Sequence, residues 1–530
     1  MSIALRNFEE GDAEAVLALM AGQAGAELAA SNYLLPESLR PQLLMDTAFG
    51  LVAEEDGHIA GTAWILMEQE TEQTVVGLLS RLCVNDGPSR SAVAANLVTT
   101  ALQSVEDNVQ HCFVEIPTTD LWQQAACEQA GFVPCGFLPH KFHGNPRGNA
   151  VVYAYLTENA RNQRRPHPEI VSSARDLAVE ALKGHGMIED VEIREDVVAY
   201  PTECNFTLAP IDTSAVQTIL EGQNRQENEI FRSLQGTQTH LNLLVEQPVY
   251  LAAKDGDRVV GVIGYIVDHF DKRIQITDVI TLEGDPQGFM IASLLEAQAQ
   301  DDAPELDYWE VMVSAHAPRM QKTLDQVGFV PCAYIPSFGM EHGLRADAIK
   351  MVKLDTAYEA ATGELTSACK NIYTIIDTIF REHGVGTAVL KLLRDLSIFR
   401  GLGEGELRRV ARLFSQKLLR PGEVVFEEGS AGSELYVIER GEIEIKTKEG
   451  DKLLGTIRSG GVIGEIAFLN GEPRTAYAVS KSATIVRVIY RTDFDRLIQH
   501  EVHLGLIFFQ NVALDLAGKL KQSVVQAKTR

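Results

Sequence analysis

An internal repeat constrains the fold of this 530-residue chain more than any other sequence feature. The pentapeptide Gly-Phe-Val-Pro-Cys at 131–135 recurs at 328–332, an offset of 197 positions. Gly61, in an apolar run after an Asp-Gly turn, recurs as Gly261 at an offset of 200. A near-constant offset between separate segments indicates duplication rather than chance. The front of the chain is therefore expected to hold two related folds in tandem.

Both copies show the same order of strand-like and helix-like segments. In each, two apolar runs flank an Asp-Gly turn, as in a β-hairpin, and a late helix ends at the glycine of the repeated pentapeptide. A further helix is expected over 214–234. The expected limits are 1–158 for copy one, 159–203 for a helical connector packed on copy one, 204–356 for copy two, and 357–389 for a helical linker broken at His383-Gly384.

This order resembles the GNAT-type N-acetyltransferase fold, most clearly in the helix–Gly–Phe–strand ending of both copies. The resemblance implies a mixed α/β sheet in which acyl-CoA lies where two central strands splay apart. It also implies a loop, Arg/Gln-x-x-Gly-x-Gly/Ala, that holds the pyrophosphate on backbone N–H groups. The residues that copy one offers for acyl-CoA, acetyl-CoA in the simplest case, are Arg90, Ser91, Ala92, Ala94 and Ala95.

Both copies depart from the GNAT pattern where the chemistry is carried. Val93 and Met290 stand where the GNAT pattern has glycine, and a side chain there hinders the approach of the backbone to the phosphate. Copy one is less obstructed than copy two, because the neighbours of Val93 are small. Cys127 and Leu324 replace a tyrosine that many family members use as general acid. Glu115 on a central strand is the candidate base for the amine, with a pKa raised by burial, or else it pairs with a neighbouring charge.

Residues 390–530 carry a different pattern of short strand-like segments separated by glycines. Their even spacing predicts a small β-barrel or jelly roll with flanking helices. Within this region the stretch 463–476 reads I-G-E-I-A-F-L-N-G-E-P-R-T-A. Its small residues let the backbone approach an anion, its arginine has a planar fork suited to phosphate, and its first glutamate is an acceptor for a sugar hydroxyl.

The stretch resembles the phosphate-binding cassette of cyclic nucleotide-binding domains, G-E-[IL]-A followed after a short gap by P-R-[AST]-A. In that family the glutamate binds the ribose 2′-hydroxyl and the arginine binds the cyclic phosphate, which implies these roles for Glu465 and Arg474. A hydroxyl at Thr475 is placed to reach the guanine side of a ligand. The residues expected to contact cAMP or cGMP are Gly464, Glu465, Ile466, Ala467, Arg474 and Thr475.

The charge distribution limits the classes of partner. The chain has a net charge of −26, yet residues 390–530 hold 22 basic and 18 acidic side chains, which leaves a net of −30 on the front part. An acidic surface repels nucleic acid and anionic membranes, so neither is an expected partner. After the predicted barrel only about one long helix fits, which leaves no room for a helix-turn-helix module.

The remaining composition favours a cytoplasmic protein without a metal site. The seven cysteines are scattered, no Cys/His ligand spacing is present, and no apolar run has the roughly 18 residues of a membrane helix. The N-terminus lacks the basic and apolar regions of a signal peptide.

The predicted fold class is therefore multidomain: two α/β GNAT-like mixed-sheet domains followed by a β-barrel cyclic nucleotide-binding domain. One functional hypothesis is an acyl-CoA-dependent N-acetyltransferase acting on a protein lysine and gated by cyclic nucleotide, for which bacterial proteins joining these domain types are a precedent. The other is a catalytically inactive GNAT-like adaptor whose partner binding is switched by cyclic nucleotide. The sequence leaves open the choice between cAMP and cGMP, the acceptor and the oligomeric state.

Overall fold

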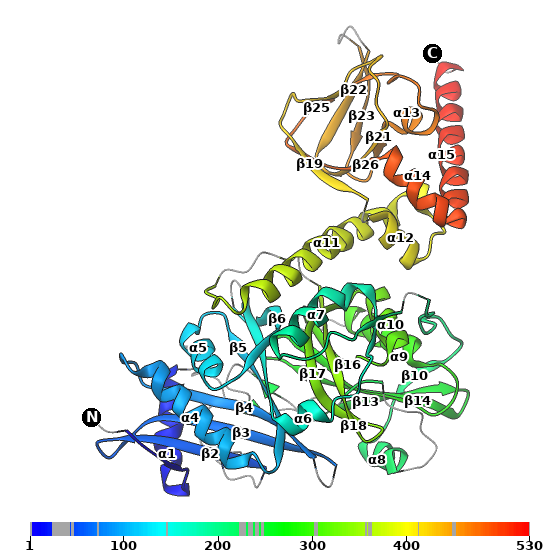
Figure 1. Cartoon of the computed structure of the whole chain (residues 1–530). Helices are drawn as coiled ribbons and strands as arrows, with labels where there is room; N and C mark the ends of the chain where they lie inside the picture. Colours follow the sequence, from blue (N-terminus) through cyan, green and yellow to red (C-terminus); the bar gives the residue numbers. More distant parts are fainter. Residues whose placement is uncertain are drawn as a thin grey trace. The chain divides into compact units, whose positions relative to one another are not determined.

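The computed structural model describes residues 3–528 except 24–42, 44–46, 72–73, 145–146, 195, 222–228, 232–236, 239–242, 245–247, 301–305, 356–357, 359–362, 412 and 448–451. The chain forms two compact units, Met1–Ile379 and Phe380–Arg530 (Figure 1). The expected copies and connector thus share one compact unit, and their exact limits stay a prediction.

The first unit is built on one continuous 14-stranded sheet. Its order is β1-β2-β3-β4-β5-β7-β6-β17-β18-β16-β15-β14-β13-β10, so that the same order of strands runs inward from each edge to the β6–β17 junction. The strands of the first half are β1 (Ala4–Asn7), β2 (Ala48–Glu55), β3 (His58–Thr71), β4 (Thr74–Val84), β5 (Val109–Pro117), β6 (Val133–Phe142) and β7 (Gly148–Leu156). Those of the second half are β10 (Thr207–Pro210), β13 (Val249–Asp255), β14 (Arg258–Asp268), β15 (Arg273–Thr281), β16 (Tyr308–Ser314), β17 (Val330–Glu341) and β18 (Leu344–Leu354).

Each half of the described sheet contains one parallel pair, which separates along its length. β4 pairs with β5 only from Val75 to Leu78, and β15 pairs with β16 only from Arg273 to Ile276. A helix connects each pair, and a second helix follows β5 or β16 and ends before the repeated glycine. These helices are α4 (Arg90–Val105) and α5 (Leu121–Gln129) in copy one, and α9 (Gln287–Gln300) and α10 (Pro318–Gln326) in copy two. The duplication predicted from the sequence is therefore present as a repeated topology.

Glycines allow the close contacts that define this repeat. A Cβ on Gly61 would lie 3.1 Å from Leu97 of α4, and a Cβ on Gly261 would lie 3.1 Å from Met290 of α9. Both glycines therefore let the connecting helix pack directly on the hairpin. At the junction of the halves, a Cβ on Gly136 would lie 2.1 Å from the Cβ of Ala333, so only glycine allows β6 to meet β17.

The segment between the copies contacts both of them, not copy one alone. Its helix α7 (Arg175–Gly184) packs on β6 and β17. In its basic run at 161–165, Arg164 pairs with Asp347 at 2.7 Å and with Asp190 at 2.8 Å, and Arg165 pairs with Glu341. The smaller elements here are α6 (Glu158–Asn162), β8 (Glu169–Ile170), η3 (Ser172–Ala174) and β9 (Glu192–Ile193).

Two helix predictions need correction. Of the helix expected over 214–234, the first part is α8 (Thr213–Glu221), residues 222–228 and 232–234 lie outside the described residues, and Ile230 is not helical but bridges to β16. The linker helix α11 (Lys370–Asp395) runs without a break through His383-Gly384, because glycine only weakens a helix. The remaining elements of the first unit are η1 (Glu10–Asp12), α1 (Ala13–Gln23), β11 (Thr237–Gln238) and β12 (Leu243–Leu244).

The second unit packs two four-stranded sheets face to face around an apolar core, as the glycine-separated strands predicted. Helices lie before and after the strands (Figure 1). The strands are β19 (Ser415–Leu419), β26 (Thr484–Tyr490), β21 (Glu434–Arg440) and β24 (Val462–Ile463) in one sheet, and β20 (Val424–Phe426), β25 (Tyr477–Ser480), β22 (Glu442–Lys446) and β23 (Leu453–Arg458) in the other. The helices are η4 (Ser397–Phe399), α12 (Glu404–Ala411), α13 (Glu465–Asn470), α14 (Arg491–His500) and α15 (Val502–Lys528).

Candidate functional site

The predicted cassette folds as a short helix, α13, held between two left-handed glycines. Gly464 precedes the helix with φ +83°, and Gly471 ends it with φ +71°. A Cβ on Gly464 would lie 2.4 Å from Nη1 of Arg474. Glycine is therefore required at 464 both for its backbone angle and for the approach of the arginine.

Arg474 points into the second unit and is only 3% exposed. Its Nη1 donates to the backbone carbonyls of Glu434 at 2.9 Å and Gly464 at 3.2 Å, and its Nη2 donates to the Glu434 carboxylate at 2.6 Å. The guanidinium lies 4.5 Å from the ring centre of Phe426 and 5.7 Å from that of Tyr436. These contacts hold the cation rigidly at one place inside the barrel.

Part of the Arg474 fork remains available. Its buried Nε has no hydrogen-bond partner among the described residues. Among the described residues, the two hydrogens of Nη2 have one acceptor, the carboxylate of Glu434. A guanidinium offers donors in a geometry that matches two phosphate oxygens. The donors that remain lie beside Gly432 and suit the oxygens of a small phosphodiester.

Sequence analysis did not assign Glu434, which is the charged partner of Arg474 at the start of β21. It lies 40 positions before the arginine, and a single glutamate ahead of an apolar strand carries no signal for such a pair. A phosphate that binds Arg474 meets this carboxylate, so Glu434 competes for the same guanidinium.

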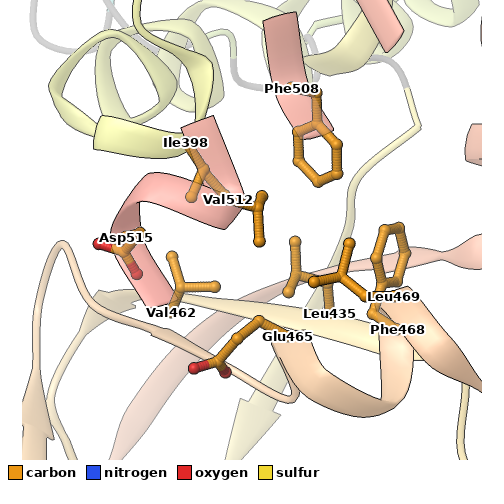
Figure 2. A pocket seen from close by; sticks show the side chains of 9 residues that line it. All are labelled: Ile398, Leu435, Val462, Glu465, Phe468, Leu469, Phe508, Val512 and Asp515. Atoms are coloured by element: carbon orange, nitrogen blue, oxygen red, sulfur yellow. The ribbon is translucent and has the colours of Figure 1, made fainter. Parts of the chain in front are cut away.

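The other predicted cassette residues lie at different depths. Ala467 is 2% exposed and packs inside, whereas Ile466 and Thr475 are exposed at the surface. Glu465 is half-buried and lines a cavity of about 10 Å³ between α13 and α15, with Val512 and Asp515 opposite (Figure 2). A cavity of this size is at the lower limit for holding one water molecule.

The terminal helix α15 packs directly on the cassette. Phe508 of α15 lies 6.1 Å from Phe468 of α13 and 4.5 Å from Phe494 of α14, measured between ring centres. Arg491 donates to the carbonyls of Phe468 and Leu469 at the end of α13. Movement of the cassette is therefore coupled by packing to α14 and α15.

A cavity of about 330 Å³ lies in copy one, at the end of β4. Arg90 closes one side, where its guanidinium stacks on Trp122 at 3.9 Å, pairs with Asp86 at 2.5 Å and donates to Gln23. Its lining comes from four elements or their adjoining loops: Ala18, Leu19, Gly22, Gln23, Cys83, Asn85, Asp86, Arg90, Asp120, Trp122 and Gln123.

The structure brings only part of the predicted acyl-CoA set to this cavity. Arg90 lines it, and Ser91 follows at the start of α4. Ala92 is exposed, whereas Ala94 and Ala95 are buried against the rest of copy one, so their side chains contact protein rather than a ligand.

In copy two the matching region is filled by the chain itself. The backbone N–H of Phe231 donates to the carbonyl of Met312 at 2.8 Å, and Ser314 N–H donates to Glu229 at 2.9 Å. Residues 229–231 thus pair along β16 beyond its parallel contact with β15. A Cβ on Gly288 would lie 2.6 Å from the carbonyl oxygens of both Tyr200 and Pro201, so the connector also covers the start of α9.

Glu115 is buried in an ion-pair network that joins the two copies. It contacts Lys141 at 3.0 Å and also pairs with Lys350 of copy two. Burial raises the pKa of Glu115, but the charges of the two lysines lower it by more than burial raises it. The pKa of Glu115 therefore lies below its ordinary value. The expected upward shift of this pKa is therefore wrong. The role of Glu115 as a base stays a prediction.

The two positions where the GNAT pattern places a general acid lie inside the protein. Cys127 and Leu324 are fully buried, and burial raises the pKa of the Cys127 thiol. Among the described residues, no group of three His, Cys, Asp or Glu is arranged to hold a metal ion. Within the same residues, no helix has the length and apolar character needed to cross a bilayer.

Comparison with known proteins identifies the second unit. Residues 416–501 match the family described as the cyclic nucleotide-binding domain. The chain is 32% identical over 106 residues to a cAMP-dependent protein kinase regulatory subunit of Yarrowia lipolytica, which covers 20% of this chain and 28% of that protein. It is 30% identical over 107 residues to a cyclic nucleotide-gated channel of Caenorhabditis elegans, which covers 19% and 15%. The chain thus spans well under half the length of these relatives.

Solved structures are similar to about a quarter of the chain. The catabolite activator protein of Thermus thermophilus shares 25% identity with a TM-score of 0.23, covering 25% of this chain and 62% of that one. A cyclic nucleotide-binding domain from Methylobacillus flagellatus shares 21% identity with a TM-score of 0.25, covering 26% and 80%. The family match at residues 416–501 shows that the chain contains a cyclic nucleotide-binding domain, whereas the GNAT resemblance of the first unit stays a prediction.

Proposed function

Because residues 416–501 form a cyclic nucleotide-binding domain, we propose that the whole chain is a cyclic nucleotide-responsive protein. Its second unit is the sensor for cAMP or cGMP, and the bound nucleotide controls the tandem modules of the first unit. The observation that carries this proposal is the buried guanidinium of Arg474, whose Nη1 lies against the glycine that opens the cassette helix and whose unpartnered Nε lies beside Gly432.

The contacts of the cassette support a two-state sensor. The cyclic phosphate takes the available donors of Arg474 in competition with Glu434, and the ribose hydroxyl goes to Glu465. The cavity between Glu465 and α15 is too small for a nucleotide base. Ligand binding therefore requires α15 to shift from its place against Phe468, and the nucleotide stabilises the shifted position.

Calorimetric titration of the full chain with cAMP and cGMP tests the sensor. Two charge-assisted hydrogen bonds contribute about 1.5–3 kcal/mol each, so Arg474→Ala is expected to weaken binding about a hundredfold or more. The matched control is Arg458→Ala on the same barrel, where the side chain is 76% exposed and pairs with Glu442. Unchanged affinity in Arg474→Ala would remove the assignment of this residue.

For the first unit, we propose GNAT-like modules in which copy one binds acyl-CoA and transfers the acyl group directly to a protein lysine. The separating parallel strands β4 and β5 and the cavity beside Arg90 support this proposal. Copy two serves as a support, because residues 229–231 pair along β16 where the resemblance places the ligand.

A second candidate is a non-catalytic adaptor whose partner binding follows the nucleotide state. It is favoured by the pairing of Glu115 with two lysines, which leaves this carboxylate without the proton affinity of a base. Titration with acetyl-CoA, in the presence and absence of cAMP, separates the candidates. Heat of binding that disappears on Arg90→Ala favours the acyltransferase, whereas no heat in either state favours the adaptor.

A further inference from the structure

A short strap, residues 363–369, ties the linker helix α11 to copy one. Gln124, which is fully buried on α5, donates from Nε2 to the carbonyl of Glu364 at 3.2 Å and accepts from the N–H of Thr366 at 3.3 Å. The N–H of Glu364 donates to the carbonyl of Thr118 at 3.1 Å. A Cβ on Gly363 would lie 2.5 Å from the hydroxyl of Thr118, so the strap lies directly on the loop between β5 and α5.

Polar contacts continue from the strap into α5 and β7. The hydroxyl of Thr366 donates to the carboxylate of Glu128 at 2.5 Å. The same carboxylate accepts from Tyr153, whose hydroxyl also lies 2.9 Å from the sulfur of Cys369. Ring centres of Tyr373 on α11 and Phe137 on β6 are 5.0 Å apart. The first turns of α11 are therefore fixed on copy one by both polar and aromatic contacts.

The next residue of α5 connects this anchor to the cavity of copy one. Gln123 lines the cavity, and its Nε2 donates to the carbonyl of Leu82 at 2.9 Å, near the end of β4. Asp120 and Trp122, also in the cavity wall, belong to the same turn. Two neighbouring glutamines thus join the strap on one side and the cavity on the other, through one rigid element.

Copy two has an equivalent glutamine, which holds a segment that does not lead to the sensor. Gln321 occupies the place of Gln124 in α10, where it donates to the carbonyl of Glu169 and accepts from the N–H of Val171. The segment it holds leads into α7, which lies wholly within the first unit. The strap instead leads into α11, which begins in the first unit and ends in the second.

We infer that the strap is the route by which the sensor regulates the cavity of copy one and leaves copy two unaffected. The inference rests on the proposed nucleotide response of the second unit. A change at the end of α11 alters the hydrogen bonds that Gln124 forms with the backbone of Glu364 and Thr366. Helix α5 then moves, and Trp122 and Gln123 move with it at the cavity wall. The regulated property is the affinity of the cavity for its ligand.

Hydrogen exchange of the full chain, measured by mass spectrometry with and without saturating cyclic nucleotide, tests this route. The nucleotide is the one that binds more tightly in a parallel calorimetric titration. Exchange in peptides that cover α5 is expected to change at least twofold, while that in the equivalent α10 stays the same. Equal changes in α5 and α10, or no change in α5 while nucleotide binds, would overturn the inference.

Removal of the Thr366 hydroxyl distinguishes the coupling between the sensor and α5 from the binding of nucleotide. Thr366→Val removes the hydrogen bond to Glu128 and is expected to leave nucleotide affinity within twofold while at least halving the exchange response of α5. The control Thr374→Val changes the same residue type on α11, where the hydroxyl bonds only the Lys370 carbonyl of its own helix, and should keep the full response. An undiminished response in Thr366→Val would contradict the route. Failure of the wild-type chain to bind nucleotide would instead refute the proposed function.

Discussion

The buried ion-pair network between the copies offers a sharp test of what holds the first unit together. Glu310 on β16 contacts Lys141 at 2.5 Å, Arg273 at 3.2 Å and Lys350 at 3.4 Å, and all four side chains are almost completely buried. Lys141 comes from copy one, whereas the other three belong to copy two. Glu310, like Glu115, therefore pairs with cations from both copies.

Glu310→Gln keeps the shape of this side chain and removes its charge. Burial raises the pKa of Glu310, but the three cations lower it far more, so the carboxylate is ionised at neutral pH. Its loss leaves the three buried cations with only Glu115 and Asp268 as anionic partners in the network. Breaking a buried ion pair by removing one partner costs about 3–5 kcal/mol, so we expect the free energy of unfolding to fall by that amount.

Tryptophan fluorescence during urea denaturation measures this effect in the first unit alone, because Trp64, Trp122 and Trp309 all lie before residue 380. The control is Glu283→Gln, which breaks the pair with Arg258 where the Glu283 side chain is 56% exposed. A pair at that exposure contributes about 0.2–1 kcal/mol. If Glu310→Gln destabilises the unit no more than the control does, the network does not join the copies as argued.

Further expectations follow from single residues. Because the folded-state pKa of Glu115 is depressed, its contribution to stability is constant from pH 7 to about 5 and is lost as the pH falls below about 4.3, which urea midpoints at several pH values will show. Gly136→Ala places a Cβ 2.1 Å from Ala333 and should destabilise the first unit by about 1–3 kcal/mol, whereas Gly148→Ala, with 3.4 Å of room, should not. Gly464→Ala should weaken nucleotide binding at least tenfold through its φ of +83° and its contact with Arg474; unchanged calorimetric affinity would contradict this. Thr475→Ala should reduce affinity for cGMP more than for cAMP in competition assays, and equal losses would argue against a guanine contact.

Much of the sensor was predictable from the sequence because its signal is local. The cassette needs a left-handed glycine, small residues and an arginine within a dozen positions, and Gly464, Ala467 and Arg474 supply them at the expected spacing. The acidic partner Glu434 was not predictable, since it lies at the start of β21, 40 positions before the arginine, and no local pattern links the two.

In the first unit the sequence by itself determined that a fold is duplicated, because the repeated Gly-Phe-Val-Pro-Cys segment and the hairpin glycines are local requirements of each copy. Only the tertiary structure decided how the copies combine. The junction at Gly136, the charges shared around Glu310 and the hold of Gln124 on the strap all join residues from distant parts of the chain. Contacts of that kind depend on how whole strands and helices meet in space. The hydrophobic periodicity along the chain does not predict them.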